Sequence, residues 1–287
     1  MLNFRTQPRW GAKFGGWAIM IVVVGFGLQP LLRGDNSESQ GRRFRLPLRA
    51  EVQVFKGSGL WQAAQLECEF STRETAIVIC DMWDKHWCTG AATRVDELAR
   101  RMEPVLEACR GAGILIIHAP SDTMEFYKGY PQRRAMLLVS PVNPPTSLGL
   151  SSPALPIDDS DRGCENPEEK EHIAWTRENA LLSMHANDLI SDNGSEIYSL
   201  LEQRGIKNLL IMGVHANMCI LNRSFAIKQM TNWGVRCVLV RDLTDAQYNP
   251  RSWPYVSHAE GTELVIQYIE KYWCPSALSG DLVNVLR

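Results

Sequence analysis

Short apolar runs alternate with longer amphipathic segments over most of this chain. Four runs have the length and continuous apolar character of strands buried on both faces, namely residues 75–80, 113–117, 208–212 and 235–240. Three segments place apolar residues at helical spacing, namely 95–111, 196–204 and 259–272. Strands that alternate with helices predict a mostly parallel sheet with helices on both faces. The fold class is therefore expected to be a three-layer α/β/α domain.

The pattern differs outside these segments. Residues 44–70 alternate apolar and polar positions around two glycines, which predicts a small antiparallel β-extension. Residues 122–174 are irregular and rich in proline, and loops of that length are usually functional or partly disordered. We expect a linker and β-extension over 35–72 and the main domain over 73–287.

The N-terminus has the layout of an export signal. Arg5, Arg9 and Lys13 precede an uncharged run over residues 14–32, which is long enough to cross a bilayer although four glycines dilute it. No clear small-x-small cleavage site follows, which favours an uncleaved anchor over a cleaved signal peptide. Residues 1–34 are therefore expected to be a signal peptide or membrane anchor, with the main domain exported to the outside of the cytoplasm.

Composition excludes several classes of partner. The chain has 287 residues, 45% of them hydrophobic and 22% charged, and a formal net charge of −2. These values are ordinary for a globular protein and argue against binding to nucleic acid or to acidic membrane surfaces. Membrane contact is expected through the N-terminal segment only.

Eight cysteines are too few for a disulfide scaffold, and none forms a Cys-x-x-Cys pair, so a zinc ribbon is not expected. Cys80 and Cys237 lie in strand-like runs and are expected to be reduced core residues. Four others lie in less regular segments and can pair if the compartment is oxidising, namely Cys68, Cys88, Cys164 and Cys274.

Cys219 is the leading candidate for chemistry. It follows the strand at 208–212 and a tight turn that begins at Gly213, and it starts a predicted helix over 219–232. A helix N-terminus favours the thiolate, and its free backbone N–H groups can hold an oxyanion. The alternative is a structural thiol, because free cysteine is among the most buried residue types.

Other polar residues are expected at the same edge of the sheet. Asp81, His118 and Asp242 each follow a predicted strand, and ligands of parallel α/β sheets bind at the carboxyl ends of strands. Asp81 is placed to accept the proton of Cys219 and return it to a leaving group. Its alternative role is to cap the turn after the strand.

With these pieces, the chain resembles the isochorismatase-like cysteine hydrolases over about residues 73–273. The resemblance rests on the strand that ends in Asp81, on the Gly213-to-Cys219 spacing, and on the helix after Cys219 with Gly234 before the next strand. It implies a Rossmann-like fold and a triad of Asp, Lys and Cys. In the amidohydrolases of the family, the cysteine attacks a carbonyl carbon and water releases the acyl-enzyme.

Carried over to this sequence, the resemblance implies Cys219 as nucleophile, Asp81 as base and the backbone N–H groups of His215 and Cys219 as oxyanion hole. It also implies a cis peptide between Val214 and His215. The chain departs at the lysine, since Arg177 stands at the expected position, 42 residues before Cys219. Arginine keeps the positive charge but does not exchange protons at neutral pH.

Two functions follow. The first is hydrolysis of a small molecule with an amide-type C–N bond, without a cofactor. The second is a catalytically altered or inactive family member that binds a small ligand or a protein partner in the same cleft. By resemblance alone, a homo-oligomer is expected.

Five side chains are candidates for contact with the substrate, namely Trp83, His86, His118, Asp122 and Tyr127. The aromatic ones are as easily explained by core packing, and the polar ones by loop hydrogen bonds. Nicotinamidases of the family bind a metal through Asp and His, but this chain lacks their Asp-x-His pattern after the second strand. No metal is therefore expected.

Overall fold

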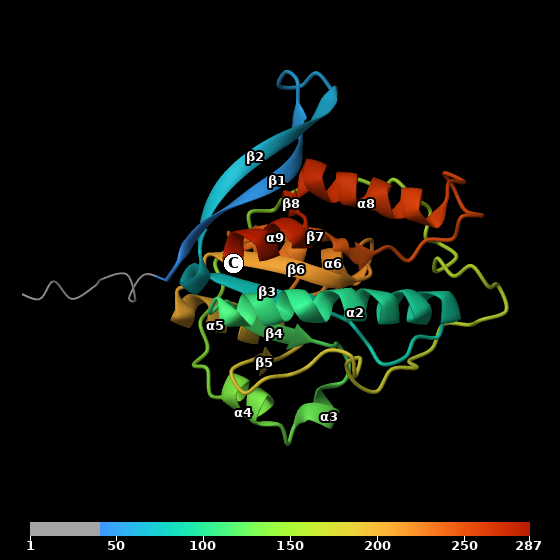
Figure 1. Cartoon of the computed structure of the whole chain (residues 1–287). Helices are drawn as coiled ribbons and strands as arrows, with labels where there is room; N and C mark the ends of the chain where they lie inside the picture. The colour runs from blue at the N-terminus through green and yellow to red at the C-terminus, as the bar shows by residue number, and fades with distance from the viewer. Residues whose placement is uncertain (1–40) are drawn as a thin grey trace, which may run out of the picture. The chain divides into compact units, whose positions relative to one another are not determined.

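A mixed sheet of eight strands organises residues 41–287, the part of the chain that the computed structural model describes (Figure 1). The strand order is β2-β1-β8-β7-β6-β3-β4-β5. Six strands run parallel, namely β3 (Thr75–Cys80), β4 (Leu115–Ala119), β5 (Leu189–Ile190), β6 (Asn208–Val214), β7 (Arg236–Asp245) and β8 (Ser276–Ala277). The first two strands, β1 (Arg43–Gln53) and β2 (Trp61–Ser71), form an antiparallel hairpin.

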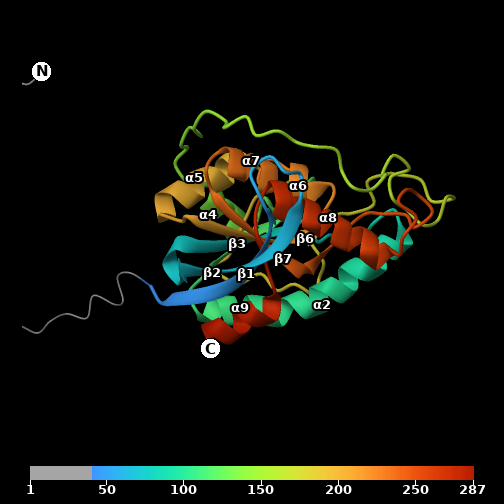
Figure 2. The ribbon, with the colours of Figure 1, turned by 90° about the horizontal axis from the view of Figure 1, so that it is seen from above.

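Helices cover both faces of the sheet, which confirms the three-layer α/β/α prediction (Figure 2). One face packs against α2 (Thr89–Gly111) and α9 (Ser279–Leu286). The other packs against α5 (Gly194–Arg204), α6 (Cys219–Asn222), α7 (Ile227–Asn232) and α8 (His258–Tyr272). Each face carries its own apolar core, because strands such as β3 and β6 are buried along their whole length.

The predicted β-extension is confirmed and belongs to the same sheet. Its two strands pair over eleven residues each, and Arg49 of β1 bridges to Ser276 of β8. A short 3₁₀ helix, η1 (Thr72–Glu74), then leads directly into β3.

Two predicted elements differ from the structure. β4 runs on to Ala119, so His118 lies inside the strand and not after it. The helix predicted over 219–232 is broken into α6 and α7, because Arg223 leaves the helical conformation (φ −60°, ψ 151°) and Phe225 is buried in the core.

The segment over 122–174 is largely irregular, as expected, but contains α3 (Met124–Tyr127) and α4 (Pro131–Leu137). A disulfide between Cys88 and Cys164 fixes its later part to the start of α2, whereas Cys68 and Cys274 are free thiols. The predicted signal peptide or anchor lies outside the described residues. Within residues 41–287, no helix combines the length and apolar character needed to span a membrane.

Candidate active site

Asp81 lies at the carboxyl end of β3, in a strained and enclosed position. Its φ is +49°, a left-handed conformation that aspartate tolerates better than most residues, and its side chain is fully buried. The Ser121 backbone N–H donates to its Oδ1 at 2.7 Å. The carboxylate is therefore held in one orientation and away from solvent.

The other oxygen of Asp81 faces a cation and a thiol. Arg223 Nε donates to Asp81 Oδ2 at 2.9 Å, and Arg223 Nη2 lies 3.2 Å from Asp122 Oδ2. The Cys219 thiol lies close enough to the Asp81 carboxylate for each group to shift the pKa of the other. Asp81 thus interacts with both Cys219, the first residue of α6, and Arg223, the residue that directly follows α6.

Burial dominates the electrostatics of this group. It raises the pKa of Asp81, although Arg223 and the hydrogen bonds from Cys219 and Ser121 oppose the shift. It also raises the pKa of Cys219 well above that of a free thiol, and the Asp81 charge raises it further while Arg223 opposes. Both effects favour the neutral thiol of Cys219 over the thiolate. The helix that starts at Cys219, α6, has only four residues, so it is shorter than the helix expected to favour the thiolate.

The turn before Cys219 presents two backbone amides. The peptide between Val214 and His215 is cis. The His215 N–H lowers the pKa of the Cys219 thiol, and no described backbone carbonyl accepts a hydrogen bond from the Cys219 N–H. Gly213 has a φ of +115°, and a Cβ there would stand 2.1 Å from the Cys80 carbonyl oxygen, so only glycine fits.

Arg177 does not occupy the position expected of it. Its Nε lies 3.9 Å from Asp84 Oδ2, its guanidinium lies 5.7 Å from the centre of the Phe126 ring, and its side chain is half exposed. Arg223 is the cation at Asp81 instead. A spacing borrowed from the family lysine pointed to Arg177, whereas the signal for Arg223 was its position four residues after Cys219 on the predicted helix.

Aromatic side chains form a wall near the turn. Trp83 is buried, stacks on Trp175 with ring centres 4.0 Å apart, and donates from its indole Nε1 to the Ser121 carbonyl at 3.0 Å. The ring of His86 lies edge-on to that of His215, with centres 5.1 Å apart. Burial lowers the pKa of His86 to about 4 and that of His215 to about 3, so both imidazoles are neutral at pH 7.

Two other candidates belong to a buried ion-pair network. His118 lies between Glu178 (Nδ1 to Oε2, 2.7 Å) and Asp188 (Nε2 to Oδ2, 3.2 Å), and the Glu178 N–H donates to the Tyr127 hydroxyl. Burial alone would lower the pKa of His118, but the two carboxylates raise it to about 9. Both ring nitrogens of His118 are occupied, so the structure does not place His118 or Tyr127 for contact with a substrate. Asp122 instead pairs with Arg223.

A cleft of about 640 Å³ opens onto Cys219. One side comes from the turn and from α6 and α7, and the other from the irregular segment. Its lining residues are Ser152, Pro153, Leu155, Asp159, Arg162, Asn217, Met218, Cys219, Asn222, Arg223 and Lys228.

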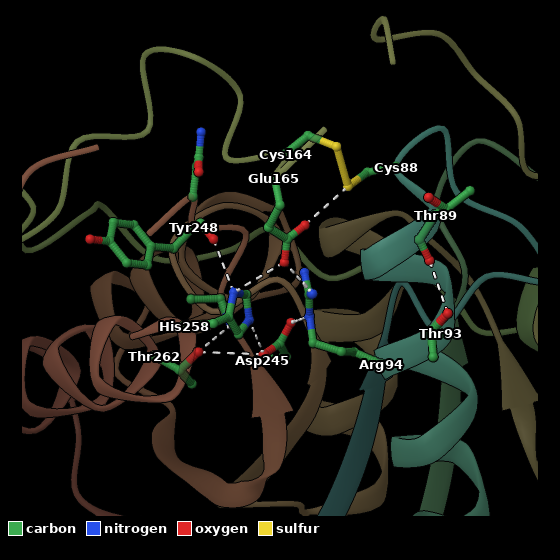
Figure 3. A network of polar contacts seen from close by, with 12 residues as sticks. Cys88, Thr89, Thr93, Arg94, Cys164, Glu165, Asp245, Tyr248, His258 and Thr262 are labelled. Atoms are coloured by element: carbon green, nitrogen blue, oxygen red, sulfur yellow. Dashed lines mark hydrogen bonds and ion pairs between the residues drawn. A yellow bond between two sulfur atoms is a disulfide. The ribbon is translucent and has the colours of Figure 1, made fainter. Parts of the chain in front are cut away.

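A polar network holds the irregular segment against the sheet (Figure 3). Next to the Cys88–Cys164 disulfide, Glu165 pairs with Arg94 of α2, which donates from Nε to Asp245 Oδ2 at 2.9 Å. His258 at the start of α8 pairs with the other oxygen of Asp245 at 2.8 Å. Asp245 is the last residue of β7, so the network joins three elements around the site.

Two groups in the described part of the chain bring three possible metal-ligand atoms together. The first is Cys88, Cys164 and Glu169, whose cysteines form the disulfide, and the second is Glu103, Glu107 and His185. The second group is partly exposed on the surface, and Arg110 Nη1 already donates to Glu107 Oε1 at 2.7 Å. None of its three residues lines the cleft at Cys219.

The sequence matches no protein-family model, and no similar curated protein was found. Three solved structures illustrate the likeness of fold. A cysteine hydrolase from Pseudomonas syringae pv. phaseolicola 1448A shares 16% identity over 76% of this chain and 94% of that chain, with a TM-score of 0.49. An isochorismatase from Pseudomonas putida KT2440 shares 14% identity over 74% of this chain and 91% of that chain, with a TM-score of 0.45. An isochorismatase-like hydrolase from Alkaliphilus metalliredigens shares 11% identity over 76% of this chain and 98% of that chain, with a TM-score of 0.45. At this level of identity the likeness concerns fold alone, so the function of the site is argued from its own geometry.

Proposed function

We propose that this protein is an isochorismatase-like cysteine hydrolase that cleaves an amide-type C–N bond of a small molecule through an acyl-enzyme on Cys219. The observation that carries the proposal is the position of the Asp81 carboxylate between the Cys219 thiol and the Arg223 guanidinium. This arrangement supplies a nucleophile, a base and a fixed cation at the carboxyl edge of the sheet.

In the first half-reaction, the Cys219 sulfur attacks the carbonyl carbon while Asp81 accepts the thiol proton. The resulting oxyanion is stabilised by the backbone N–H groups of His215 and Cys219. Asp81 then gives the proton to the departing nitrogen, the C–N bond breaks, and an amine or ammonia leaves.

In the second half-reaction, water attacks the thioester while Asp81 accepts one of its protons. The C–S bond breaks, the carboxylic acid leaves, and the proton returns from Asp81 to the Cys219 sulfur. The raised pKa of Asp81 suits this cycle, because the buried carboxyl must hold a proton during each half-reaction.

Arg223 acts as a fixed charge in this scheme. A guanidinium does not release its proton at neutral pH, so it cannot serve as acid or base. It opposes the rise that burial causes in the pKa of Asp81, and its hydrogen bond to Oδ2 fixes the orientation of the carboxylate.

A release assay tests the proposal. Ammonia is measured from a panel of small primary amides with wild type, Cys219→Ala, Asp81→Asn and the matched control Cys68→Ser. We expect activity to vanish in Cys219→Ala and to fall about 10²–10⁴-fold in Asp81→Asn, the usual range for a lost general base. Wild-type rates in Cys219→Ala would exclude the mechanism. A complete panel without turnover, together with an unreactive Cys219, would favour the ligand-binding alternative.

A further inference from the structure

We propose that the cleft at Cys219 takes an anionic substrate, in which a carboxylate a few bonds from the scissile amide pairs with Lys228. This inference rests on the proposed function of Cys219 and adds the substrate class.

Lys228 is a cation of the cleft without an acidic partner. It lies on α7, donates from Nζ to the Asn222 Oδ1 at 2.9 Å, and stands 5.5 Å from the centre of the Trp273 ring. Among residues 41–287, no carboxylate lies within ion-pair distance of it. Burial lowers the pKa of Lys228, as expected for an ammonium that has lost water without gaining a counter-charge. A bound carboxylate would supply that charge.

The other two cations of the cleft have acidic partners, whereas Asp159 has no cationic partner among the described residues. Arg223 lies between Asp81 and Asp122. Arg162 lies 3.0 Å from Glu171, with both side chains more than half exposed, and the Asn217 amide donates to Asp159 Oδ2 at 2.9 Å. Lys228 is therefore the cation of the cleft whose surroundings gain a counter-charge when an anion binds.

The cleft also limits the size of the substrate. A volume of about 640 Å³ lies within the range of small-molecule sites, which is roughly 300–1,000 Å³. Pro153, Leu155 and Met218 add apolar wall between the charged groups. A short aliphatic chain with an amide at one end and a carboxylate at the other, such as the monoamide of a dicarboxylic acid, matches these features.

Alkylation of Cys219 separates charge recognition from turnover. Iodoacetate and iodoacetamide differ in their charge, and site-resolved mass spectrometry gives the rate of each at Cys219. The reference is the same thiol in the urea-unfolded chain. We expect the iodoacetate-to-iodoacetamide rate ratio to be at least about tenfold higher in the folded protein. Lys228→Met should lower this ratio about tenfold, which corresponds to about 1.4 kcal/mol.

Lys207→Met is the matched control, because Lys207 pairs with Glu74 at the opposite edge of the sheet and its loss changes the net charge equally. It should leave the ratio unchanged. Glutarate should also protect Cys219 from iodoacetamide in wild type and much less in Lys228→Met. The substrate class alone is overturned if the iodoacetate-to-iodoacetamide rate ratio is the same in the folded and the unfolded protein. It is also overturned if Lys228→Met and Lys207→Met lower this ratio equally. Failure of both reagents to alkylate folded Cys219 overturns the proposed function as well.

Discussion

The identity of the cation beside Asp81 determines the chemistry at the residue scale. Arg223 contacts the carboxylate directly at 2.9 Å, whereas Arg177 lies against Asp84 and Phe126. A charge in contact with a buried carboxylate shifts its pKa strongly, but an exposed pair is screened by solvent. The two arginines are therefore expected to contribute very differently to activity.

Paired substitutions test this difference. Arg223→Met should lower amide hydrolysis at least about 10²-fold, because Asp81 loses its counter-charge and its pKa rises further. Arg177→Gln should change the rate less than about threefold, since its contacts are mostly exposed. Ammonia release from the most active amide gives both rates. Circular dichroism and urea unfolding show whether each variant is folded, and a larger loss in Arg177→Gln would assign the cation to Arg177.

The local motif around Cys219 was predictable from the sequence, but its charge state was not. The strand, Gly213 and Cys219 form a contiguous pattern, so the order of strand, turn and helix start over residues 208–219 follows from the local sequence. The pKa of the thiol depends instead on burial and on Asp81, which comes from a distant part of the chain. Arg223 was missed although it stands four residues after Cys219 on the predicted helix, because the spacing of the family lysine favoured Arg177.

At the scale of elements, tertiary contacts determine where β4 ends and whether His118 is buried. His118 was expected at the open end of the strand, but β4 continues through it and pairs with β5. Glu178 and Asp188 then enclose the imidazole from the segment that precedes and enters β5. A two-residue strand such as β5 is too short to be recognised from its pattern, so the burial of His118 could not be predicted.

This network makes stability depend on pH in a defined window. The pKa of His118 is raised to about 9 in the folded protein, from an ordinary value of 6.5. Its contribution is therefore fully present below pH 6.5 and is lost as pH rises toward 9, with a total of about 3 kcal/mol. The difference in unfolding free energy between wild type and His118→Gln should shrink over that range.

Urea unfolding at several pH values gives this difference, and His185→Gln serves as a surface histidine control. If His118→Gln does not fold, the imidazole resonances of His118 in wild type give its pKa directly. A value near 6.5 would contradict the ion-pair network.

At the scale of the whole molecule, the irregular segment must be held in place for the cleft to exist. Residues 152–162 line one side of it, and the disulfide between Cys88 and Cys164 ties the following residues to α2. Glu165 and Glu169 add polar contacts to Arg94 and Thr89. The three-layer fold was predictable from alternating strands and helices, whereas the path of this segment depends on these long-range contacts.

Loss of the disulfide should therefore affect both stability and the cleft. We expect the Cys88→Ser/Cys164→Ser double variant to lose about 2–4 kcal/mol of unfolding free energy. Urea unfolding measures the loss, and hydrogen exchange should show faster exchange over residues 158–171 with little change in β3 and β6. Cys68→Ser is the control. Equal stability and exchange in the double variant and wild type would show that the polar contacts alone hold the segment.

The most direct measurement of the central claim is the mass of the Cys219 peptide after acid quench during turnover of an active amide. The mechanism predicts a mass increase equal to the acyl group on Cys219, which decays as the carboxylic acid appears. Asp81→Asn should show little of this adduct. An adduct on another residue, or turnover with no adduct on Cys219 at any quench time, would contradict the cysteine hydrolase mechanism.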